Sequence, residues 1–172
     1  MAQDVSQARS QGNFSLTDPT QALIHDHNYV KQLMQRYLSA KQPLVKKQAG
    51  PEICSALQTH SRLEESVFYP RVHELNPTLV DQFESDHQTA DEIIEKMQAL
   101  EAGEAEYDEL MQRLQEAITA HIELEESQLF PLVRTSNMDL QDLELRMQAF
   151  ESNIVATQAI GTPRAQPGTS MP

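Results

Sequence analysis

The sequence contains few cysteine, glycine and aromatic residues. Its single cysteine, Cys54, excludes an internal disulfide and fits a reducing cytoplasm. Cys54 falls on the same predicted helix as His60 but is rotated away from it, so we expect a small core or boundary residue rather than a metal ligand. Glycine is scarce, with 5 residues, tryptophan is absent, and Gln, Glu, Ala and Leu are abundant. This composition favours a small helical bundle.

Basic charge and long apolar runs are also lacking. The chain has 13 Lys and Arg residues against 26 Asp and Glu residues, which gives a formal net charge of −13. Such an acidic surface repels a phosphate backbone, so nucleic acid is not an expected partner. The first residues show neither the basic start nor the apolar run of a signal peptide, and no stretch is apolar enough to span a membrane. We therefore expect a single-domain cytoplasmic protein of 172 residues.

Helix-boundary signals divide the chain into four long helices. Capping residues followed by proline mark two starts, at Asp18-Pro19 and Asn76-Pro77, and Gly50-Pro51 marks another. Gly103 is a plausible C-terminal glycine, and Pro70 must kink or end the second helix nearby. The expected helices span about residues 18–41, 50–70, 76–103 and 105–131. Their short connections favour antiparallel neighbours, so we expect an all-α fold, an up-down four-helix bundle.

A short additional helix is expected after the bundle. Ser136-Asn137-Met138-Asp139 resembles a helix start, and the following segment carries apolar residues such as Leu143 and Met147 but no potential metal ligand. This helix is expected to brace the bundle or, alternatively, to bind a protein partner or a second copy of the chain. We assign residues 1–16 to a flexible N-terminal arm, 17–134 to the bundle, 135–156 to the additional helix and 157–172 to a disordered tail.

Two stretches of the sequence repeat the same chemistry. Residues 60–70 and 121–131 each contain a His-x-x-x-Glu-Glu-Ser unit and end in an aromatic residue and proline, and an Asp-His pair precedes each stretch at nearly the same spacing. A histidine and a glutamate four residues apart share one face of a helix, so each unit can offer an imidazole and a carboxylate to one metal centre. The repeat indicates an internal duplication and suggests a pair of metals.

The candidate ligands fall on the apolar faces of the predicted helices. His27 lies on a stripe with Leu23 and Val30, and Glu64 lies on a stripe with Ile53 and His60. Burying unpaired carboxylates costs several kcal/mol each, and a bound cation would offset that cost. A single such unit would carry little information, but the repeated set predicts a metal site. The six expected ligands are His27, His60, Glu64, His87, His121 and Glu125.

Other polar residues near the motifs are assigned lesser roles. His25 faces away from the stripe of His27 and is expected at the surface, and His73 has no counterpart in the second half. Four acidic neighbours of the ligands are left open, either as supports that accept the outer N–H of a bound imidazole or as solvated residues. They are Asp26, Glu65, Asp86 and Glu126.

With these motifs, the chain resembles a hemerythrin-like, or HHE cation-binding, domain over roughly residues 18–133. The resemblance implies an up-down four-helix bundle with a non-haem di-iron centre and an oxo or hydroxo bridge. Carried over by position, it implies the six ligands named above, with Glu64 and Glu125 as bridging carboxylates.

The chain also departs from the oxygen carriers of this family. The carriers have a fifth histidine, four residues from another on the third helix, where this chain has Phe83 and Asp91 around His87. Their second carboxylate is an aspartate five residues after its histidine, whereas Glu125 follows at four. We therefore expect a di-iron protein that binds or senses O₂ or NO, or handles iron; zinc and manganese also suit these donors. The alternatives are a di-iron oxidase or peroxidase and a structural metal-binding protein that presents its fifth helix to a partner.

Overall fold

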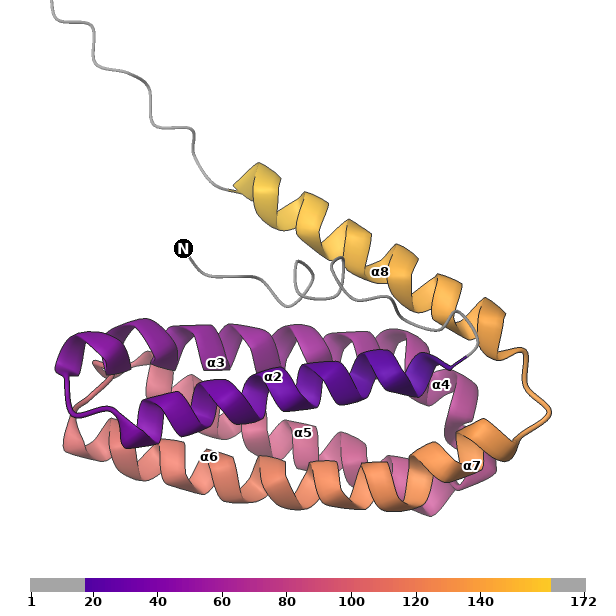
Figure 1. Ribbon diagram of the computed structural model, residues 1–172, viewed down its shortest axis with the longest axis horizontal. Coiled ribbons are helices and arrows are strands. Elements are labelled where there is room, and N and C mark those ends of the chain that lie inside the picture. The colour runs from indigo at the N-terminus through magenta and orange to yellow at the C-terminus, as the bar shows by residue number, and fades with distance from the viewer. Residues whose placement is uncertain (1–17, 162–172) are drawn as a thin grey trace, which may run out of the picture.

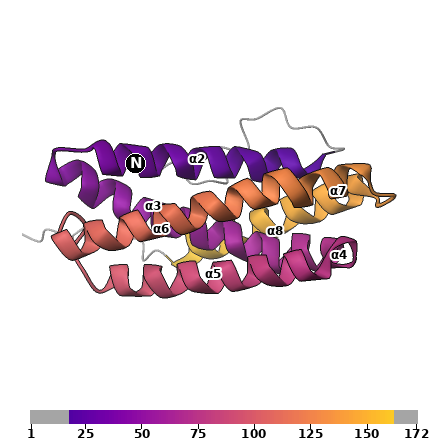
Figure 2. The same cartoon turned by 90° about the horizontal axis from the view of Figure 1, so that it is seen from below.

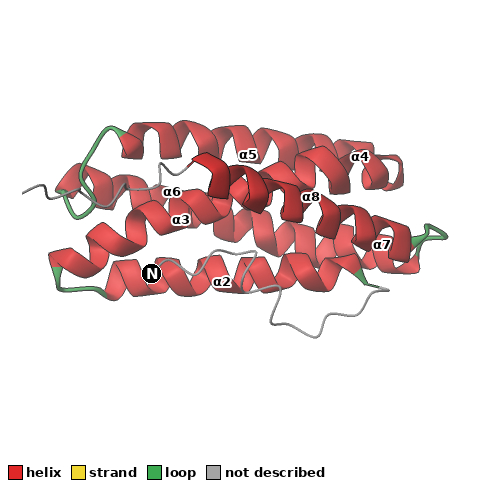
Figure 3. Ribbon diagram, turned by 90° about the horizontal axis from the view of Figure 1, so that it is seen from above, coloured by secondary structure: helices red, strands yellow, loops and turns green. Residues whose placement is uncertain are grey.

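The computed structural model describes residues 18–161, which form helices with no β-strand among them (Figure 3). Consecutive long helices run in opposite directions, as the up-down prediction requires (Figure 1). These four helices are α2 (Pro19–Ser39), α3 (Pro43–Leu63), α5 (Pro77–Gln98) and α6 (Ala105–Leu124). The predicted all-α fold, a four-helix bundle with an additional C-terminal helix, is confirmed. The predicted N-terminal arm, residues 1–16, lies outside the described residues.

Side-chain caps start the helices where the sequence predicted them. The Asp18 carboxylate accepts from the backbone N–H of Thr20 at 3.1 Å, and the Asn76 side chain accepts from the N–H of Leu79 at 3.2 Å. A proline follows each cap, at a position where the helix needs no N–H donor. These caps fix the starts of α2 and α5, which carry His27 and His87.

Two of the predicted boundaries are wrong. The second long helix begins at Pro43 rather than at Gly50, and Pro51 lies inside it. Gly50 serves close packing instead, because a Cβ atom there would lie 2.5 Å from the Tyr107 hydroxyl and 2.9 Å from Ala102 Cβ. The third long helix ends at Gln98, and Gly103 lies in the following loop with a φ of 99°. Gly103 thus provides a left-handed turn before α6 rather than a helix end.

The helices continue past Pro70 and Pro131 by widening rather than ending. The five residues that start at each candidate ligand glutamate form π-helical turns, η1 (Glu64–Phe68) and η3 (Glu125–Leu129). In each turn the next N–H, of Tyr69 or Phe130, reaches back five residues to the glutamate carbonyl. The turns occur just before prolines that cannot donate a backbone hydrogen bond, and such π turns are frequent at functional sites. The segments that follow are α4 (Tyr69–Val72), the 3₁₀ turn η2 (His73–Leu75) and α7 (Phe130–Thr135).

The additional helix, α8 (Leu140–Gly161), packs on α2, α3 and η1 and is inclined to the bundle, so that its C-terminal end lies away from it (Figure 1). The Asp139 carboxylate accepts from the N–H of Asp142 at 2.9 Å, and Leu143 and Met147 are buried against the bundle. The helix continues beyond its predicted end at residue 156, so residues 157–161 are helical rather than part of a tail. The remainder of the predicted tail lies outside the described residues.

The bundle interior contains two apolar clusters with a polar layer between them. One cluster includes Val30, Leu57 and Ile94, and the other includes Leu23, Leu63 and Phe83, together with residues of α4, α7 and α8. The candidate ligands, which come from the four long helices and the two π turns, are buried and belong to neither apolar cluster. The four long helices run side by side when the bundle is viewed from below (Figure 2). Within the described residues, no helix has the length and apolar character required to cross a bilayer.

Candidate metal centre

All six predicted ligand residues are buried in the centre of the bundle. Glu64 and Glu125 have no exposed surface, and the four histidines are 2 to 6% exposed. The predicted inward orientation of the histidines is therefore confirmed. The four long helices supply the histidines, one each, and the two π turns supply the glutamates.

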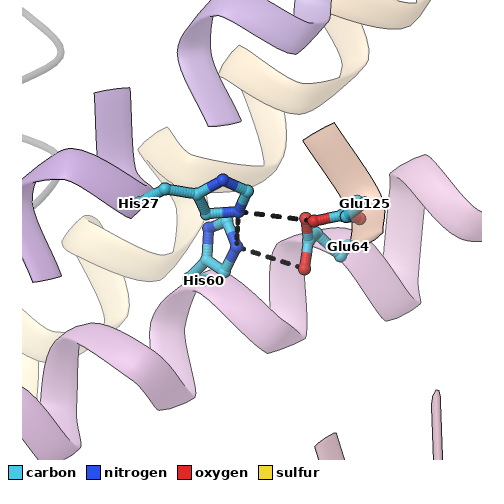
Figure 4. A group of neighbouring side chains, drawn as sticks. All are labelled: His27, His60, Glu64 and Glu125. Carbon is cyan, nitrogen blue, oxygen red and sulfur yellow. Dashed lines mark hydrogen bonds and ion pairs between the residues drawn. The ribbon is translucent and has the colours of Figure 1, made fainter. Parts of the chain in front are cut away.

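Each glutamate lies between histidines from the two halves of the duplicated sequence. Glu64 Oε2 is 3.2 Å from His60 Nε2 and 3.3 Å from His87 Nε2. Glu125 Oε2 is 3.4 Å from His27 Nε2 and 3.7 Å from His121 Nε2. The HxxxE spacing places each glutamate beside its own histidine, and the bundle brings the second histidine from another helix (Figure 4).

The donor atoms form two groups that share a carboxylate. His27, His60, Glu64 and Glu125 each offer one ligand atom, and all of these atoms lie within 4.8 Å of one another. Glu64, His87 and His121 form the second group under the same limit. Two neighbouring metal positions with a carboxylate between them are compatible with this arrangement.

The donors also fit a metal by their spacing and by their unmet hydrogen-bonding capacity. Two donors at about 2.1 Å from a metal and at a right angle to each other lie about 3 Å apart. The Nε2 atoms of His27 and His60 are 3.1 Å apart. Glu64 Oε1 and both ring nitrogens of His121 are buried without a hydrogen-bond partner. Buried polar atoms rarely lack a partner, and a cation between them would satisfy these donors.

The outer nitrogens of two histidines are held by glutamates of the opposite half. Glu126 Oε1 is 2.8 Å from His27 Nδ1, and Glu65 Oε1 is 3.0 Å from His87 Nδ1. A carboxylate in this position fixes the ring orientation and leaves Nε2 free to face a metal. Glu65 and Glu126, left open by the sequence, therefore support the site.

The aspartates that precede His27 and His87 approach the other two histidines. Asp26 Oδ2 is 3.3 Å from His60 Nδ1, and Asp86 Oδ2 is 3.6 Å from His121 Nδ1. Asp26 is almost completely buried, whereas the side chain of Asp86 is 38% exposed. The two halves thus have equivalent aspartates beside their histidines, but the aspartate of the first half is buried and that of the second half is partly exposed.

The pKa values of the site show how the buried charges balance without a metal. Burial lowers the pKa of His60, but the charge of Glu64 and a hydrogen bond to Asp26 outweigh it and raise the pKa to about 10. The pKa of His87 is raised to about 9, since hydrogen bonds to Glu64 and Glu65 again outweigh burial. Burial opposes ionisation of Glu64, yet its charged histidine neighbours hold its pKa well below the usual range. Protonated histidines therefore compensate the buried carboxylate.

His121 behaves differently from the other three histidines. Burial is the largest effect on it and lowers its pKa to about 4, despite the opposing charge of Glu125. For His27, burial is outweighed by hydrogen bonds to Glu125 and Glu126, and the pKa is raised. His121 is therefore neutral at pH 7, the protonation state in which an imidazole nitrogen can bind a metal.

Tyr69 is a component of the site that sequence reasoning missed. It has no exposed surface, and its hydroxyl lies 3.1 Å from Glu125 Oε1 and 3.3 Å from Glu64 Oε2. Burial, followed by the charges of the two glutamates, raises the pKa of the phenol well above its usual value, so Tyr69 is a hydrogen-bond donor. The available signal was a difference between the repeats, because the equivalent residue in the second half is Phe130.

Residues that were expected to lie outside the site do so. His25 is partly exposed, and His73 is exposed and pairs with Asp81 at 2.9 Å. Cys54 is buried, and its thiol lies 3.9 Å from the Tyr107 hydroxyl. None of the three belongs to either group of donors.

A small cavity adjoins the histidines. Its lining includes all four site histidines and neither glutamate, and apolar side chains form most of the rest. The lining residues are Asp26, His27, Val30, Leu57, His60, Ser61, His87, Ile118, His121 and Ile122. The cavity, of about 10 Å³, has room for about one water-sized molecule beside the histidines.

The comparison with protein families decides the assignment. Residues 18–133 match the hemerythrin HHE cation-binding domain. The chain belongs to this family. The matched residues run from the cap of α2 into α7 and include every donor of the centre, whereas α8 lies beyond them. No match was found among curated proteins or solved structures.

Proposed function

We propose that this hemerythrin-like protein holds a non-haem di-iron centre and uses it to bind or sense O₂ or NO, or to handle iron. The observation that carries the proposal is the position of the two glutamates, since an oxygen of each faces histidine Nε2 atoms from both halves of the bundle. Carboxylates placed in this way would hold two metals between them, and four imidazoles would complete the protein donors.

The residues of this chain would hold the two metals and leave open positions beside them. Four imidazoles and two bridging carboxylates provide about eight of the roughly twelve positions of two octahedral metals. Iron, once bound, supplies reversible redox change and a site for an exogenous ligand. The cavity beside the histidines would limit that ligand to a very small molecule, because its volume is about 10 Å³, and its apolar lining, including Leu57 and Ile118, favours a weakly polar one.

Metal analysis of the full chain tests the di-iron assignment. Protein supplied with iron and freed of excess should contain about two irons per chain, as two groups of donors require. Supply with zinc or manganese in parallel measures how strongly the donors select among metals. A reproducible content near one iron, with every donor engaged in a crystal structure, would refute the di-iron centre.

Optical spectra separate ligand binding from an enzymatic use of the same centre. Anaerobically reduced protein should form a stable adduct with O₂ or NO that is lost when the gas is removed. Steady consumption of O₂ or peroxide would instead favour a di-iron oxidase or peroxidase, and Tyr69 beside both glutamates is the feature most compatible with that alternative. A colourless zinc-containing protein whose spectrum does not change with O₂ or NO would favour a structural role with α8 as a partner-binding surface.

The proposed setting is a reducing cytoplasm. Cys54 is a free, buried thiol, and no other cysteine is available to pair with it.

A further inference from the structure

The two halves of the centre differ in the support that their histidines receive. Asp26 accepts from His60 at 3.3 Å and has 2% of its side chain exposed. Its counterpart Asp86 is 3.6 Å from His121, has 38% of its side chain exposed, and leaves both nitrogens of that ring without a hydrogen-bond partner. One histidine of the duplicated pair is held in place by a buried carboxylate, and the other is not.

The additional helix packs mainly on elements of the first half. Helix α8 packs on α2, α3 and η1, which carry Asp26, His60 and Glu64 (Figures 1 and 3). Leu143 and Met147 anchor it, with 1% and 0% exposure. The described part of the chain holds one such helix for two duplicated halves, and its main contacts are with the half that contains Asp26.

The distances between the glutamates and the histidines differ in the same sense. Glu125 Oε2 is closer to His27 Nε2, at 3.4 Å, than to His121 Nε2, at 3.7 Å. Support of the histidines, packing of α8 and the position of Glu125 therefore all favour the same metal position.

We propose that the two metal positions are inequivalent: the metal beside His27 and His60 binds more tightly and exchanges more slowly than the metal beside His87 and His121. This inference rests on the proposed dinuclear function. Asp26 is a positioning residue in it, because a carboxylate that accepts the outer N–H of a bound imidazole orients the ring and increases its basicity. The effect is larger at the buried Asp26 than at the exposed Asp86. A half-loaded chain accordingly holds its metal beside His27 and His60.

Release of cobalt to a chelator tests this order, with Asp26 and Asp86 as a matched pair. The full chain is loaded with two Co²⁺ ions, excess EDTA is added, and retained cobalt is followed by absorbance and by metal analysis. The wild type should release cobalt in a fast and a slow phase of equal amplitude. Asp26→Asn should accelerate the slow phase by about 10- to 100-fold, the usual effect of losing such a support, and Asp86→Asn should leave that phase unchanged.

Two substitutions on α8 test the role of its cover. Leu143→Ala removes a buried anchor and should accelerate the slow phase, whereas Leu145→Ala changes a side chain that is 51% exposed and should alter neither phase. Circular dichroism checks that each variant retains its helices. If Leu143→Ala fails to fold, the aspartate pair still decides the proposal.

The possible outcomes separate this inference from the proposed function. Two bound cobalt ions released in a single phase, equal acceleration by the two asparagine variants, or acceleration of the slow phase by Asp86→Asn alone would overturn the inequivalence and leave the dinuclear centre intact. Uptake of one cobalt or none would overturn both.

Discussion

The hydroxyl of Tyr69, in the first half of the duplicated sequence, donates to Glu125 Oε1, in the second half, at 3.1 Å. The same oxygen lies 3.3 Å from Glu64 Oε2, so one side chain contacts both central carboxylates. The equivalent residue of the second half is Phe130, which has no hydroxyl; its ring stacks on His27 with centroids 5.8 Å apart, as the Tyr69 ring stacks on His87 at 5.5 Å. The duplicated site therefore has a single phenol, and it joins the two halves.

Tyr69→Phe should destabilise the metal-free protein more than the metal-loaded protein. Without a metal, loss of the hydroxyl removes a hydrogen-bond donor from buried carboxylates, which costs about 1 to 3 kcal/mol. With a metal, the carboxylates have another partner and the loss is smaller. Chemical denaturation of both forms measures this. Tyr37→Phe is the control, because its hydroxyl pairs with Asp108 and Gly103 away from the site, and it should affect both forms equally. Equal losses in the two forms of Tyr69→Phe would contradict the prediction.

His27→Ala should lose iron or its visible absorption, whereas His25→Ala should retain both. The two histidines are two residues apart on α2, but only His27 belongs to a group of donors. Metal analysis and absorbance of the two purified variants provide the comparison. Comparable loss in both would mean that metal is not held by the inward face of α2.

The bundle and the inward histidines could be predicted because their signals are local. Caps such as Asp18 and Asn76 mark helix starts, and the helical period places His27 and His87 on apolar faces. The prediction of a helix start at Gly50 was wrong because this glycine allows close packing against Tyr107, which lies on a helix distant in the sequence.

The partners of the ligands could not be predicted, since they depend on the tertiary fold. Glu126 and His27 are 99 positions apart in the sequence and meet only when η3 lies beside α2. Tyr69 reaches both glutamates after a π turn that the helical period of the sequence does not reveal. The Asp-His pairs have nearly the same spacing in both halves, so the sequence could not show that Asp26 is buried and Asp86 is partly exposed. That difference accompanies the packing of α8 on one side of the bundle.

The chelated protein should lose stability as the pH rises from about 6.5 to 9. The pKa values of His60 and His87 are raised in the folded state to about 10 and 9, so over this range the folded protein retains protons that the unfolded chain has released. Stability then falls with rising pH. Each unit of difference in pKa is worth about 1.4 kcal/mol, so we expect a loss of at least about 1 kcal/mol. Urea unfolding at several pH values measures it; constant or rising stability would contradict the charge balance described above.

The acid side should show the opposite slope. His121, with its pKa lowered to about 4, resists the proton that the unfolded chain accepts below pH 6.5, and Glu64 ionises more readily in the folded state. Stability should therefore fall as the pH drops from 6.5 toward 4. A His121→Gln variant, which keeps a polar side chain without this titration, should reduce the slope below pH 6.5 and leave the slope above it unchanged.

Replacing both central glutamates should uncouple metal from stability. Glu64→Gln combined with Glu125→Gln preserves size and hydrogen-bonding capacity but removes two buried charges, and amides are weak bridges for iron. We expect this double variant to bind little iron and to show a much smaller fall in melting temperature on chelation than the wild type, whose centre gains stability from the metal.

The variant should also lose most of the fall in stability between pH 6.5 and 9, because Glu64 is a principal cause of the raised pKa values of His60 and His87. Glu65→Gln with Glu126→Gln is the matched control: it removes the same number of charges from the outer side of the histidines and should retain iron, though more weakly. Thermal melts of the three proteins with iron and with chelator give the comparison. An identical fall in the wild type and in the Glu64/Glu125 variant would mean that the central carboxylates are not the link between metal and folding.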